Sequence, residues 1–455
     1  VIYDLLCKRS DCFLGMELMN VDLPTIDSGR SVSAFRQDPK LVAAIDALFR
    51  TNIQDKLNGS SRFVLPERKL QFCEVQKLLK LSFEKVKQKS LEALLKETNE
   101  TRKALIEKVE KILENINKSA ENGEVPQLEI RNQRLWSNCI YDLDKVTLKS
   151  FNDAKKTKLC YSATEDKTRF NIIVFVLTKV HELLMKNLTV TRRELFYQNV
   201  TRIRNQANLD VAVRDVCCLL ESPPWTLGIV ATAKGLVAGA LTIVCRDGSM
   251  VDCMTSGGTL IPQDVNGIKE FRSTAKYILV VEKDAIFQKL LDEGALVRLG
   301  PLIIITGKGY PDICTRLLLR RLRAELRLPA LALVDADPHG MEIFLTYKYG
   351  SLAQSHLSSS LACSSLVLLG ARQCDVMTLA PNEVRMRLTD LDKRKLNSLL
   401  GRPYLNTVIG SQIKEELTSM MASGVKVEIE AIAPTAAALC DAYMPAKIIQ
   451  GDFLG

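Results

Sequence analysis

Apolar and polar positions change their spacing along the chain, and each change marks a different kind of segment. Residues 1–68 have no clear period, so we expect a poorly defined N-terminal extension there. Over residues 69–126, leucine, valine and isoleucine recur at helical spacing between lysines and glutamates. The pattern predicts amphipathic helices that close at Asn122-Gly123. It favours solvated helices over the alternative, a helix that docks a partner protein.

Residues 127–266 are predicted to form strands and turns around Trp136, then helices, then more strands. Helices are expected at 170–186, from 189 or 191 to about 199, and at about 209–220. Strands are expected at 227–231, 236–245 and 250–254, the last two joined in a hairpin at Asp247-Gly248. Thr191 and Glu194 have the spacing of a capping box. Three helices followed by a hairpin is the order of a winged helix, a module that binds DNA.

The spacing changes again after Asn266-Gly267. Continuous apolar runs occupy 277–281, 302–305 and 331–334, and amphipathic helices are expected between them at 284–292 and 312–327. Buried strands that alternate with helices predict a parallel sheet covered on both faces. The predicted fold class is therefore mixed α/β and α+β. It comprises a helical N-terminal region, a winged-helix domain at 127–266 and an α/β domain with a largely parallel sheet at 267–455.

Composition narrows the function classes. With 455 residues, 47% of them hydrophobic and 25% charged, the chain is neither largely disordered nor a collagen or coiled-coil rod. No apolar run approaches the ~18 residues that span a bilayer, so we expect no membrane partner. The net charge of +9 is compatible with nucleic-acid binding without requiring it. The 13 cysteines have no metal-binding spacing, which predicts reduced thiols rather than a zinc site.

Acidic residues follow two of the predicted buried strands. Glu282 closes the first, and Asp335 and Asp337 close the third. Two residues apart on an extended segment, the two aspartates point to the same side. Three carboxylates at one sheet edge repel one another unless a cation lies between them, and Mg²⁺ suits such a set. The alternative is that an aspartate merely caps the next helix; the combination of three acids favours the metal site.

A tyrosine is the candidate nucleophile. Tyr197 lies four residues after Arg193, on the same helical face, where a guanidinium can stabilise the phosphate that the tyrosine attacks. Spacing alone favours a packing role, because a phenol with a pKa near 10 is a poor nucleophile.

Further basic side chains are candidate DNA contacts, or ordinary solvated charges: Lys234, Arg202, Arg204, Arg214 and Lys308. Lys308 belongs to the Gly-rich turn 306–312, whose amides can approach a phosphate but which lacks the spacing of a P-loop. His339 follows the D-x-D run, and the sequence leaves open whether it orients an acid or caps a helix.

Together these motifs resemble one family. From about residue 104 onward the chain looks like the meiotic double-strand-break transesterases of the sporulation-protein-eleven type, eukaryotic homologues of the A subunit of topoisomerase VI. The resemblance rests on RRELFY at 192–197, TAKGLVAG at 232–239, VVEKDAIFQ at 280–288, ITGKGYPDICTR at 305–316, LVDADPHGMEI at 333–343 and YKYGS at 347–351. Weaker echoes follow at 402–404 and 425–432.

The resemblance implies a winged helix that carries the nucleophile, followed by a metal-binding Toprim domain. It implies that Tyr197 is the nucleophile and that Arg193 and Lys234 lie near the scissile phosphate. By the same likeness, Glu282, Asp335 and Asp337 hold Mg²⁺. The family often has two adjacent tyrosines, of which the second reacts; this chain has Phe196 before Tyr197 and keeps the reactive position.

The implied activity is magnesium-dependent cleavage of DNA through a 5′-phosphotyrosyl intermediate, which initiates meiotic recombination. The implied partners are double-stranded DNA, a second copy of the chain and a topoisomerase VI B-like subunit, in the nucleus. One alternative is the A subunit of topoisomerase VI itself, a type IIB enzyme that works with an ATP-binding B subunit. A second is a non-catalytic DNA-binding scaffold. Another Toprim enzyme, such as a primase or nuclease, fits less well because those enzymes lack the tyrosine-bearing winged helix.

Overall fold

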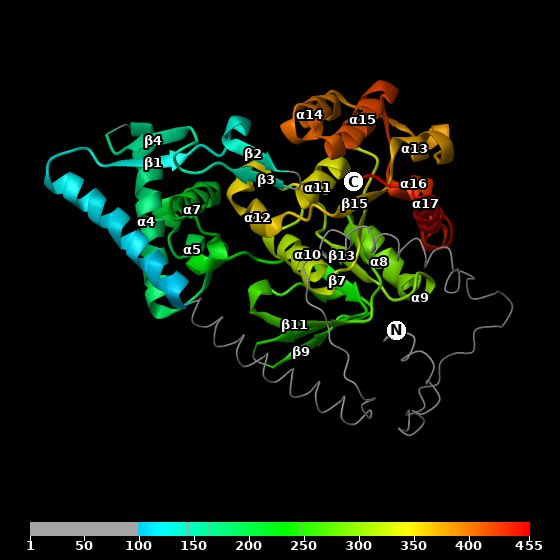
Figure 1. Cartoon of the computed structure of the whole chain (residues 1–455), viewed down its shortest axis with the longest axis horizontal. Helices are drawn as coiled ribbons and strands as arrows, with labels where there is room; N and C mark the ends of the chain where they lie inside the picture. Colours follow the sequence, from blue (N-terminus) through cyan, green and yellow to red (C-terminus); the bar gives the residue numbers. More distant parts are fainter. Residues whose placement is uncertain (1–98, 143–144, 163, 247) are drawn as a thin grey trace, which may run out of the picture. The chain divides into compact units, whose positions relative to one another are not determined.

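The computed structural model describes residues 99–455, apart from 143–144, 163 and 247 (Figure 1). The predicted extension at 1–68 and the first part of the amphipathic segment lie outside the described residues. The second part is a helix at 99–121, as predicted. Its Leu105 and Val109 are buried in a core shared with the following helices, and Glu110 bonds His181 at 2.9 Å. The apolar stripe of this helix thus packs against the chain itself.

The three helices predicted after residue 160 are present. Together with short strands they form a helical unit: β1 (Gln127–Arg131), β4 (Lys156–Cys160), α4 (Thr164–Lys186), β5 (Val190–Thr191), α5 (Arg192–Tyr197), α6 (Val200–Ile203), α7 (Gln206–Leu220) and β6 (Ile229–Val230). The hairpin of β2 (Cys139–Asp142) and β3 (Lys145–Leu148) comes between β1 and β4 in the chain, but its Cys139 and Val146 are buried in the core of the large sheet described below. The predicted capping box is confirmed, since Thr191 Oγ1 accepts from the Glu194 amide and the Glu194 carboxylate accepts from the Thr191 amide. Leu195 of α5, Leu209 of α7 and Val176 of α4 share one core.

The predicted strand 236–245 is in fact two strands in different sheets. β7 (Leu236–Gly239) pairs with β13 (Ile303–Thr306), whereas β8 (Leu241–Cys245) pairs with β9 (Met250–Asp252) and β11 (Ile268–Ser273). The break comes at Gly239, where φ is +113° and a Cβ would lie 2.1 Å from the Leu302 carbonyl oxygen. A larger residue cannot occupy this position.

This arrangement corrects the predicted winged-helix hairpin. The β8–β9 hairpin forms as predicted, but Leu241 and Ile243 are buried in the core of the large sheet rather than beside the three helices. The antiparallel pair that packs on α4 and α7 is β1–β4, through Leu128, Ile130 and Leu159. The strands on either side of residue 266 share one hydrophobic core with the large sheet, so the predicted domain boundary at 266 falls inside that core.

A six-stranded sheet organises the rest of the chain, in the order β10-β7-β13-β12-β14-β15. Besides β7 and β13 it contains β10 (Thr259–Leu260), β12 (Ile278–Val281), β14 (Ala330–Leu333) and β15 (Leu366–Gly370). β12 is parallel to both β13 and β14, and β14 is parallel to β15, which confirms the predicted parallel sheet. At the other side of the sheet, β7 is antiparallel to β13, and the edge strand β10 is antiparallel to β7.

Both faces of this sheet are covered. Ile278 and Val280 of β12 belong to a core that includes α10 (Ile313–Leu326) and α11 (Pro338–Lys348). Leu279 and Val281 belong to a second core that includes α8 (Asp284–Asp292). The continuous apolar runs of the sequence therefore alternate between two cores, as expected for strands buried on both faces.

Shorter elements complete the structure. These are α9 (Ala295–Arg298), α12 (Ser358–Leu361), α13 (Gln373–Leu379), β16 (Met386–Arg387), α14 (Asp390–Leu400), α15 (Val408–Ser423), β17 (Val425–Lys426), α16 (Ile429–Ile432) and α17 (Met444–Gln450), with short 3₁₀ turns such as Leu352–Leu357 between them. Every described cysteine is a free thiol. Among the described helices, none is both long enough and apolar enough to cross a membrane.

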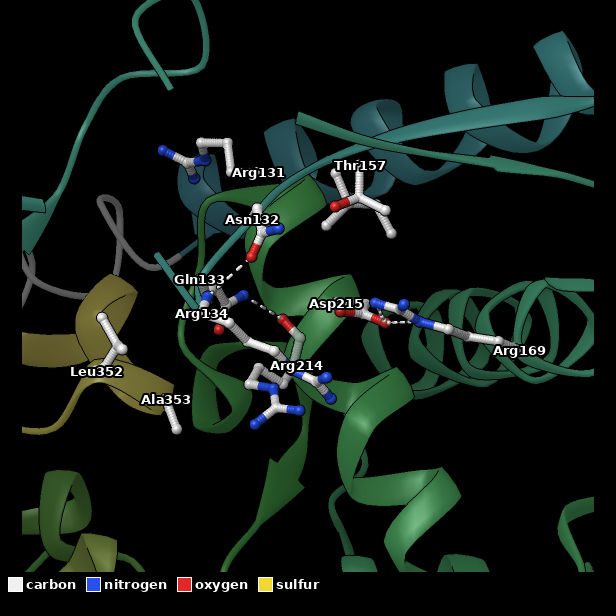
Figure 2. Close-up of a pocket in the computed structure, with 11 residues that line it drawn as sticks. Arg131, Asn132, Gln133, Arg134, Thr157, Arg169, Arg214, Asp215, Leu352 and Ala353 are labelled. Atoms are coloured by element: carbon white, nitrogen blue, oxygen red, sulfur yellow. Dashed lines mark hydrogen bonds and ion pairs between the residues drawn. The ribbon is translucent and has the colours of Figure 1, made fainter. Parts of the chain in front are cut away.

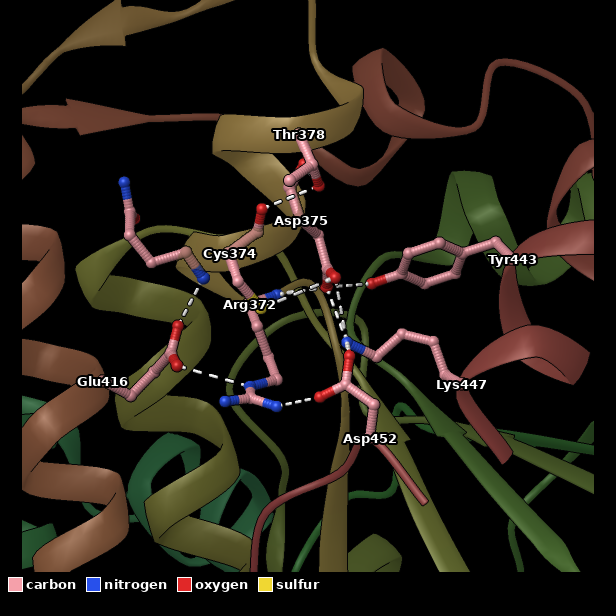
Figure 3. Close-up of polar contacts among 9 residues, drawn as sticks. Arg372, Cys374, Asp375, Thr378, Glu416, Tyr443, Lys447 and Asp452 are labelled. Carbon is pink, nitrogen blue, oxygen red and sulfur yellow. Dashed lines mark hydrogen bonds and ion pairs between the residues drawn. The ribbon is translucent and has the colours of Figure 1, made fainter. Parts of the chain in front are cut away.

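A buried ion-pair network fixes the C-terminal segment (Figure 3). Asp375 of α13 accepts hydrogen bonds from Lys447 Nζ at 2.9 Å and from Tyr443 Oη at 2.6 Å. Lys447 also pairs with Asp452 at 2.9 Å, and Arg372 pairs with Asp452 and with Glu416. Because Asp375 and Lys447 are both buried, each depends on the other for its charge to be tolerated.

We expect Lys447→Met to lower the free energy of unfolding by about 3–5 kcal/mol, because it leaves the Asp375 carboxylate buried without its cation. Urea denaturation followed by circular dichroism measures the loss. The control is Lys393→Met, since Lys393 is exposed and lies 4.0 Å from Asp390, an exposed pair worth under about 1 kcal/mol. Equal losses in the two variants would show that the buried pair is not a stabilising contact.

Candidate active site

Polar residues meet at the edge of the sheet where β12, β13 and β14 end. Glu282 follows β12, and one of its carboxylate oxygens accepts from the Asp335 amide at 2.9 Å. Asp335 follows β14, and the next residue, Ala336, pairs with Val427, which keeps the segment extended. Gly340 borders the same space, because a Cβ there would lie 2.9 Å from the Glu282 carboxylate. The parallel register thus places Glu282 and Asp335 side by side, whereas the ligand atoms of Glu282, Asp335 and Asp337 do not all lie within 4.8 Å of one another in the described structure.

These carboxylates are crowded. Burial, and then the negative charges of Asp335 and Asp337, raise the pKa of Glu282 to about 8. Burial also raises the pKa of Asp335, although the Ile429 amide and Lys283 donate hydrogen bonds to it. Asp337 caps α11, since its Oδ1 accepts from the Gly340 amide at 2.6 Å. The helix-cap interpretation therefore holds for Asp337, and it coexists with the convergence of the acids.

Sequence reasoning missed three charged residues at this edge. Lys283 Nζ lies 2.9 Å from Asp335, 3.1 Å from Glu430 and 3.4 Å from Glu428. Glu428 and Glu430 belong to the segment 425–432, which the sequence marks only as a weak family echo, and the Ala336–Val427 bridge brings that segment here. A single lysine thus stands among five carboxylates. An excess of carboxylate oxygens at a strand edge is a donor set that fits a hard divalent cation.

A second acidic group has its donor atoms closer together than the predicted metal ligands do. Cys374, Asp375 and Asp452 place one ligand atom each within 4.8 Å of one another, the one such group of three among the described residues. Its two carboxylates, however, are already matched by the cations of Lys447 and Arg372 (Figure 3). The charge is balanced there, whereas it is not balanced around Glu282. We therefore assign the C-terminal group a structural role.

Two of the predicted basic residues lie beside the acidic edge. Lys234 Nζ donates to the Lys308 carbonyl at 3.3 Å, and the Lys234 amide donates to Asp312 at 2.7 Å. The Gly-rich turn is tied to the edge in turn, because the Gly309 amide donates to the Glu282 carbonyl at 2.9 Å. The Lys308 ammonium pairs with Asp284 at 3.0 Å. Positive charge thus lies next to the crowded carboxylates.

The predicted nucleophile lies on another element. Tyr197 ends α5 and is 70% exposed, whereas Leu195 is buried and Phe196 packs against the core of the helical unit. Arg193 is also exposed, and its side chain forms no hydrogen bond or ion pair with any residue of the described chain. No contact between described residues joins Tyr197 to Glu282, Asp335 or Asp337. The structure therefore presents the tyrosine to solvent, apart from the acids.

The remaining basic candidates do not join either group. Arg202 is exposed on α6 and covers the ring of Phe175 at 4.9 Å. Arg204 is exposed, with φ at +65°, and ends the same helix. Arg214 on α7 lines a separate pocket that is described below. No contact between described residues links these three arginines to the predicted metal ligands.

His339 contacts a hydrogen-bonded cluster rather than an acid of the edge. Tyr310 Oη lies 3.3 Å from His339 Nδ1 and donates to Glu342 at 2.5 Å. Glu342 also pairs with Lys395 and with Arg402. Burial alone would raise the pKa of Glu342, but the hydrogen bonds from Lys395 and Tyr310 and the charge of Arg402 outweigh it and lower the pKa to about 2. The cluster anchors the Gly-rich turn to α11 and α14.

Comparison with known proteins places these features in a family. Residues 277–448 match the model of the Toprim domain of the topoisomerase 6 A subunit and Spo11, and residues 168–229 match that of type IIB DNA topoisomerase. The chain is 35% identical to the mouse (Mus musculus) meiotic recombination protein SPO11 over 349 residues, 76% of this chain and 87% of the relative. It is 35% identical to the A subunit of DNA topoisomerase 6 of Arabidopsis thaliana over 327 residues, 70% of this chain and 75% of the relative. It is 36% identical to the meiotic recombination protein W68 of Drosophila melanogaster over 301 residues, 65% of this chain and 88% of the relative.

The Glu342 cluster predicts a pH dependence. The unfolded chain takes up a proton on this glutamate near its usual pKa of 4.5, whereas the folded chain does so only near 2. The stability that Glu342 contributes is therefore complete above about pH 4.5 and is lost as the pH falls from 4.5 towards 2.

We expect Glu342→Gln to lower the free energy of unfolding by about 1–3 kcal/mol at pH 7 and to reduce the further loss on acidification. Urea titrations at pH 7, 5 and 3 measure both effects. Glu383→Gln, at an exposed position, is the control and should follow the wild type. If Glu342→Gln loses as much stability on acidification as the wild type, the acid sensitivity comes from other carboxylates.

Proposed function

The chain belongs to the family of SPO11 meiotic recombination proteins and topoisomerase 6 A subunits, and we propose that it makes DNA double-strand breaks that initiate meiotic recombination. One observation carries the proposal: a single chain combines an exposed tyrosine on a capped helix with a crowded acidic site at the edge of a Toprim sheet. A nuclear location follows from an activity on chromosomal DNA.

The reaction is a transesterification. Tyr197 Oη forms a bond to a backbone phosphorus while the bond from phosphorus to the 3′ oxygen breaks. The phenol loses its proton and the leaving 3′ oxygen gains one, so that the DNA ends in a 3′ hydroxyl. The product is a 5′-phosphotyrosyl link, a covalent enzyme intermediate. Arg193, four residues before Tyr197, stabilises the negative charge that develops on the phosphate. Lys234 and Lys308, beside the acidic edge, bind the neighbouring phosphates.

Glu282, Asp335 and Asp337 are the residues that would hold Mg²⁺. The fit rests on the excess of carboxylates at this edge, where Lys283 is the one cation of the described chain that pairs with them. Burial, and then the charges of Asp335 and Asp337, raise the pKa of Glu282 to about 8. When bound, the ion supplies positive charge to the phosphate oxygens. Lys283 keeps Asp335 oriented through its contact at 2.9 Å and links it to Glu428 and Glu430.

Double-strand cleavage requires two copies of the chain, because each has one such tyrosine. We infer that Tyr197 of one protomer meets the acids of its partner, in support of which no described contact joins the two groups within one chain. A B-like subunit is the expected further partner. The helices α4, α5 and α7 with the β1–β4 pair are the proposed winged-helix module that carries the tyrosine onto duplex DNA.

A second candidate function is that of a topoisomerase 6 A subunit, which cleaves and reseals DNA with an ATP-binding partner. It is favoured by the 35% identity to the Arabidopsis topoisomerase 6 A subunit, the same value as to mouse SPO11. The cleavage residues serve both functions equally. Strand passage that depends on ATP, assayed with the purified chain and its B-type partner, would establish this second function; breaks without resealing would exclude it.

We expect Tyr197→Phe to abolish covalent attachment to DNA, because the phenolic oxygen is the atom that bonds to phosphorus. Protein from cells entering meiosis is purified under denaturing conditions, and the attached DNA ends are labelled. Tyr161→Phe is the matched control, an exposed tyrosine outside the proposed site that should retain the label. Label that persists on Tyr197→Phe would assign the nucleophile to another residue. An unlabelled wild type that still binds DNA would favour the non-catalytic scaffold.

We expect Mg²⁺ to stabilise the wild type, by about 2.7 kcal/mol at a concentration about 100 times its Kd, and Asp335→Asn to lose that gain. Thermal unfolding with Mg²⁺ and with EDTA measures it. Asp452→Asn is the contrasting variant, because Asp452 belongs to the second acidic group, and it should retain the gain. The reverse result, with the gain lost only in Asp452→Asn, would move the metal site to the C-terminal group.

A further inference from the structure

A pocket lined by four arginines lies between the helical unit and the 3₁₀ turn Leu352–Leu357 (Figure 2). Its volume is about 470 Å³, which falls within the roughly 300–1,000 Å³ of small-molecule sites. The arginines are Arg131, Arg134, Arg169 and Arg214, and Asp215 is the one carboxylate among the lining residues. None of these residues belongs to the proposed cleavage site, although the sequence marks Arg214 as a candidate DNA contact.

Two of the four arginines are engaged in the structure of the wall. Arg131 is buried and donates to the carbonyls of Lys149 and Cys218, and it pairs with Glu221 at 3.2 Å. Arg169 donates to Asp215 through two nitrogens, each at 2.8 Å. Asp215 is therefore turned toward Arg169, as Figure 2 shows, and its charge is already matched. These contacts hold the wall of the pocket in place.

The other two guanidinium groups have no counter-ion. Within the described chain, the side chains of Arg134 and Arg214 form no hydrogen bond or ion pair, and both reach into the pocket (Figure 2). The backbone of both residues is tied to the pocket wall, because the Arg134 amide donates to Asn132 and the Arg214 carbonyl accepts from Gln133. The pocket is therefore lined by two guanidinium groups whose hydrogen-bond donors are unused within the described chain.

The arginines of this region contribute to lowering the pKa of a neighbouring side chain, His356. Burial, and then the charges of Arg131, Arg214 and Arg192, lower the pKa of His356 to about 3. His356 belongs to the same 3₁₀ turn as the residues Leu352 and Ala353 that line the pocket. The direction of this shift agrees with the presence of several arginines around the pocket.

We propose that this pocket binds a phosphate group, held between Arg134 and Arg214. Guanidinium groups bind phosphate oxygens through pairs of parallel hydrogen bonds, a geometry that a single charge does not supply. The phosphate belongs either to the DNA backbone or to a small free ligand. Both present non-bridging phosphate oxygens, with one negative charge on a phosphodiester and up to two on a free phosphate. Because Arg214 is on α7 and the opposite wall is the turn after α11, a bound phosphate also fixes the helical unit against the Toprim domain.

Calorimetric titration of the full chain with inorganic phosphate, in chloride buffer at constant ionic strength, tests this proposal. We expect the double variant Arg134→Gln/Arg214→Gln to bind phosphate at least tenfold more weakly than the wild type. The matched control is Arg387→Gln/Arg394→Gln, which removes the same charge at two exposed positions and should bind like the wild type. Arg134→Gln alone, at an exposed position, gives a partial loss and guards against misfolding of the double variant.

A second arm separates the two sources of the phosphate. The binding of a short duplex is measured over a range of salt concentrations. If the DNA backbone supplies the phosphate, the double variant lowers the salt slope by about 1 relative to the control pair. If a free ligand supplies it, the slope is unchanged while phosphate binding is lost. Either result supports the pocket.

Three results would overturn the proposal. They are no phosphate binding by the wild type, equal binding by the double variant and the wild type, and acetate binding as tightly as phosphate, which would show selection for charge alone. The outcome is independent of the proposed cleavage activity, since phosphate binding is measured without DNA and without turnover. A chain that binds phosphate here but never attaches to DNA would keep this site and lose the proposed function.

Discussion

Repulsion among carboxylates at the carboxyl edge of a parallel sheet is the constraint on which the candidate site depends. Glu282, Asp335 and Asp337 come together because β12 and β14 are adjacent and parallel, and the segment around Val427 adds Glu428 and Glu430. Among the described residues, Lys283 is the one cation that pairs with them. The fold tolerates this repulsion because the strands that carry the acids are held in place by a hydrophobic core on each face of the sheet. The acids are thereby held ready for a cation that the chain itself does not supply.

The separation of the nucleophile from the acids has a functional meaning. Tyr197 is exposed on a short helix whose start is fixed by a capping box, while the acids lie on strand ends of a different unit. We propose that the two groups come together only when another copy of the chain supplies the missing half. In the proposed mechanism the chemistry is therefore governed by assembly, which suits a protein that cuts a chromosome.

Local sequence signals predicted most of the elements, and their failures have physical causes. The helices after residue 160 and the buried strands were correct to within a few residues, because amphipathic spacing and continuous apolar runs reflect burial directly. The strand 236–245 was wrong because nothing in the apolar pattern marks the break at Gly239, which is required by the close approach of the Leu302 carbonyl. The prediction that the β8–β9 hairpin packs on the three helices was also wrong. The strand pair that packs there is β1–β4, and the choice between the two depends on contacts between residues distant in sequence.

The sequence by itself determined the family likeness and proposed the reactive groups: the tyrosine, the three acids and the basic residues nearby. Only the tertiary structure decided how they are grouped. It placed Lys283, Glu428 and Glu430 among the acids, matched the C-terminal acids with Lys447 and Arg372, and left the Arg134 and Arg214 side chains without a partner among the described residues. The reason is that charge balance is a property of space. Whether a carboxylate or guanidinium is paired depends on residues that lie far away along the chain, and the local spacing of residues does not reveal them.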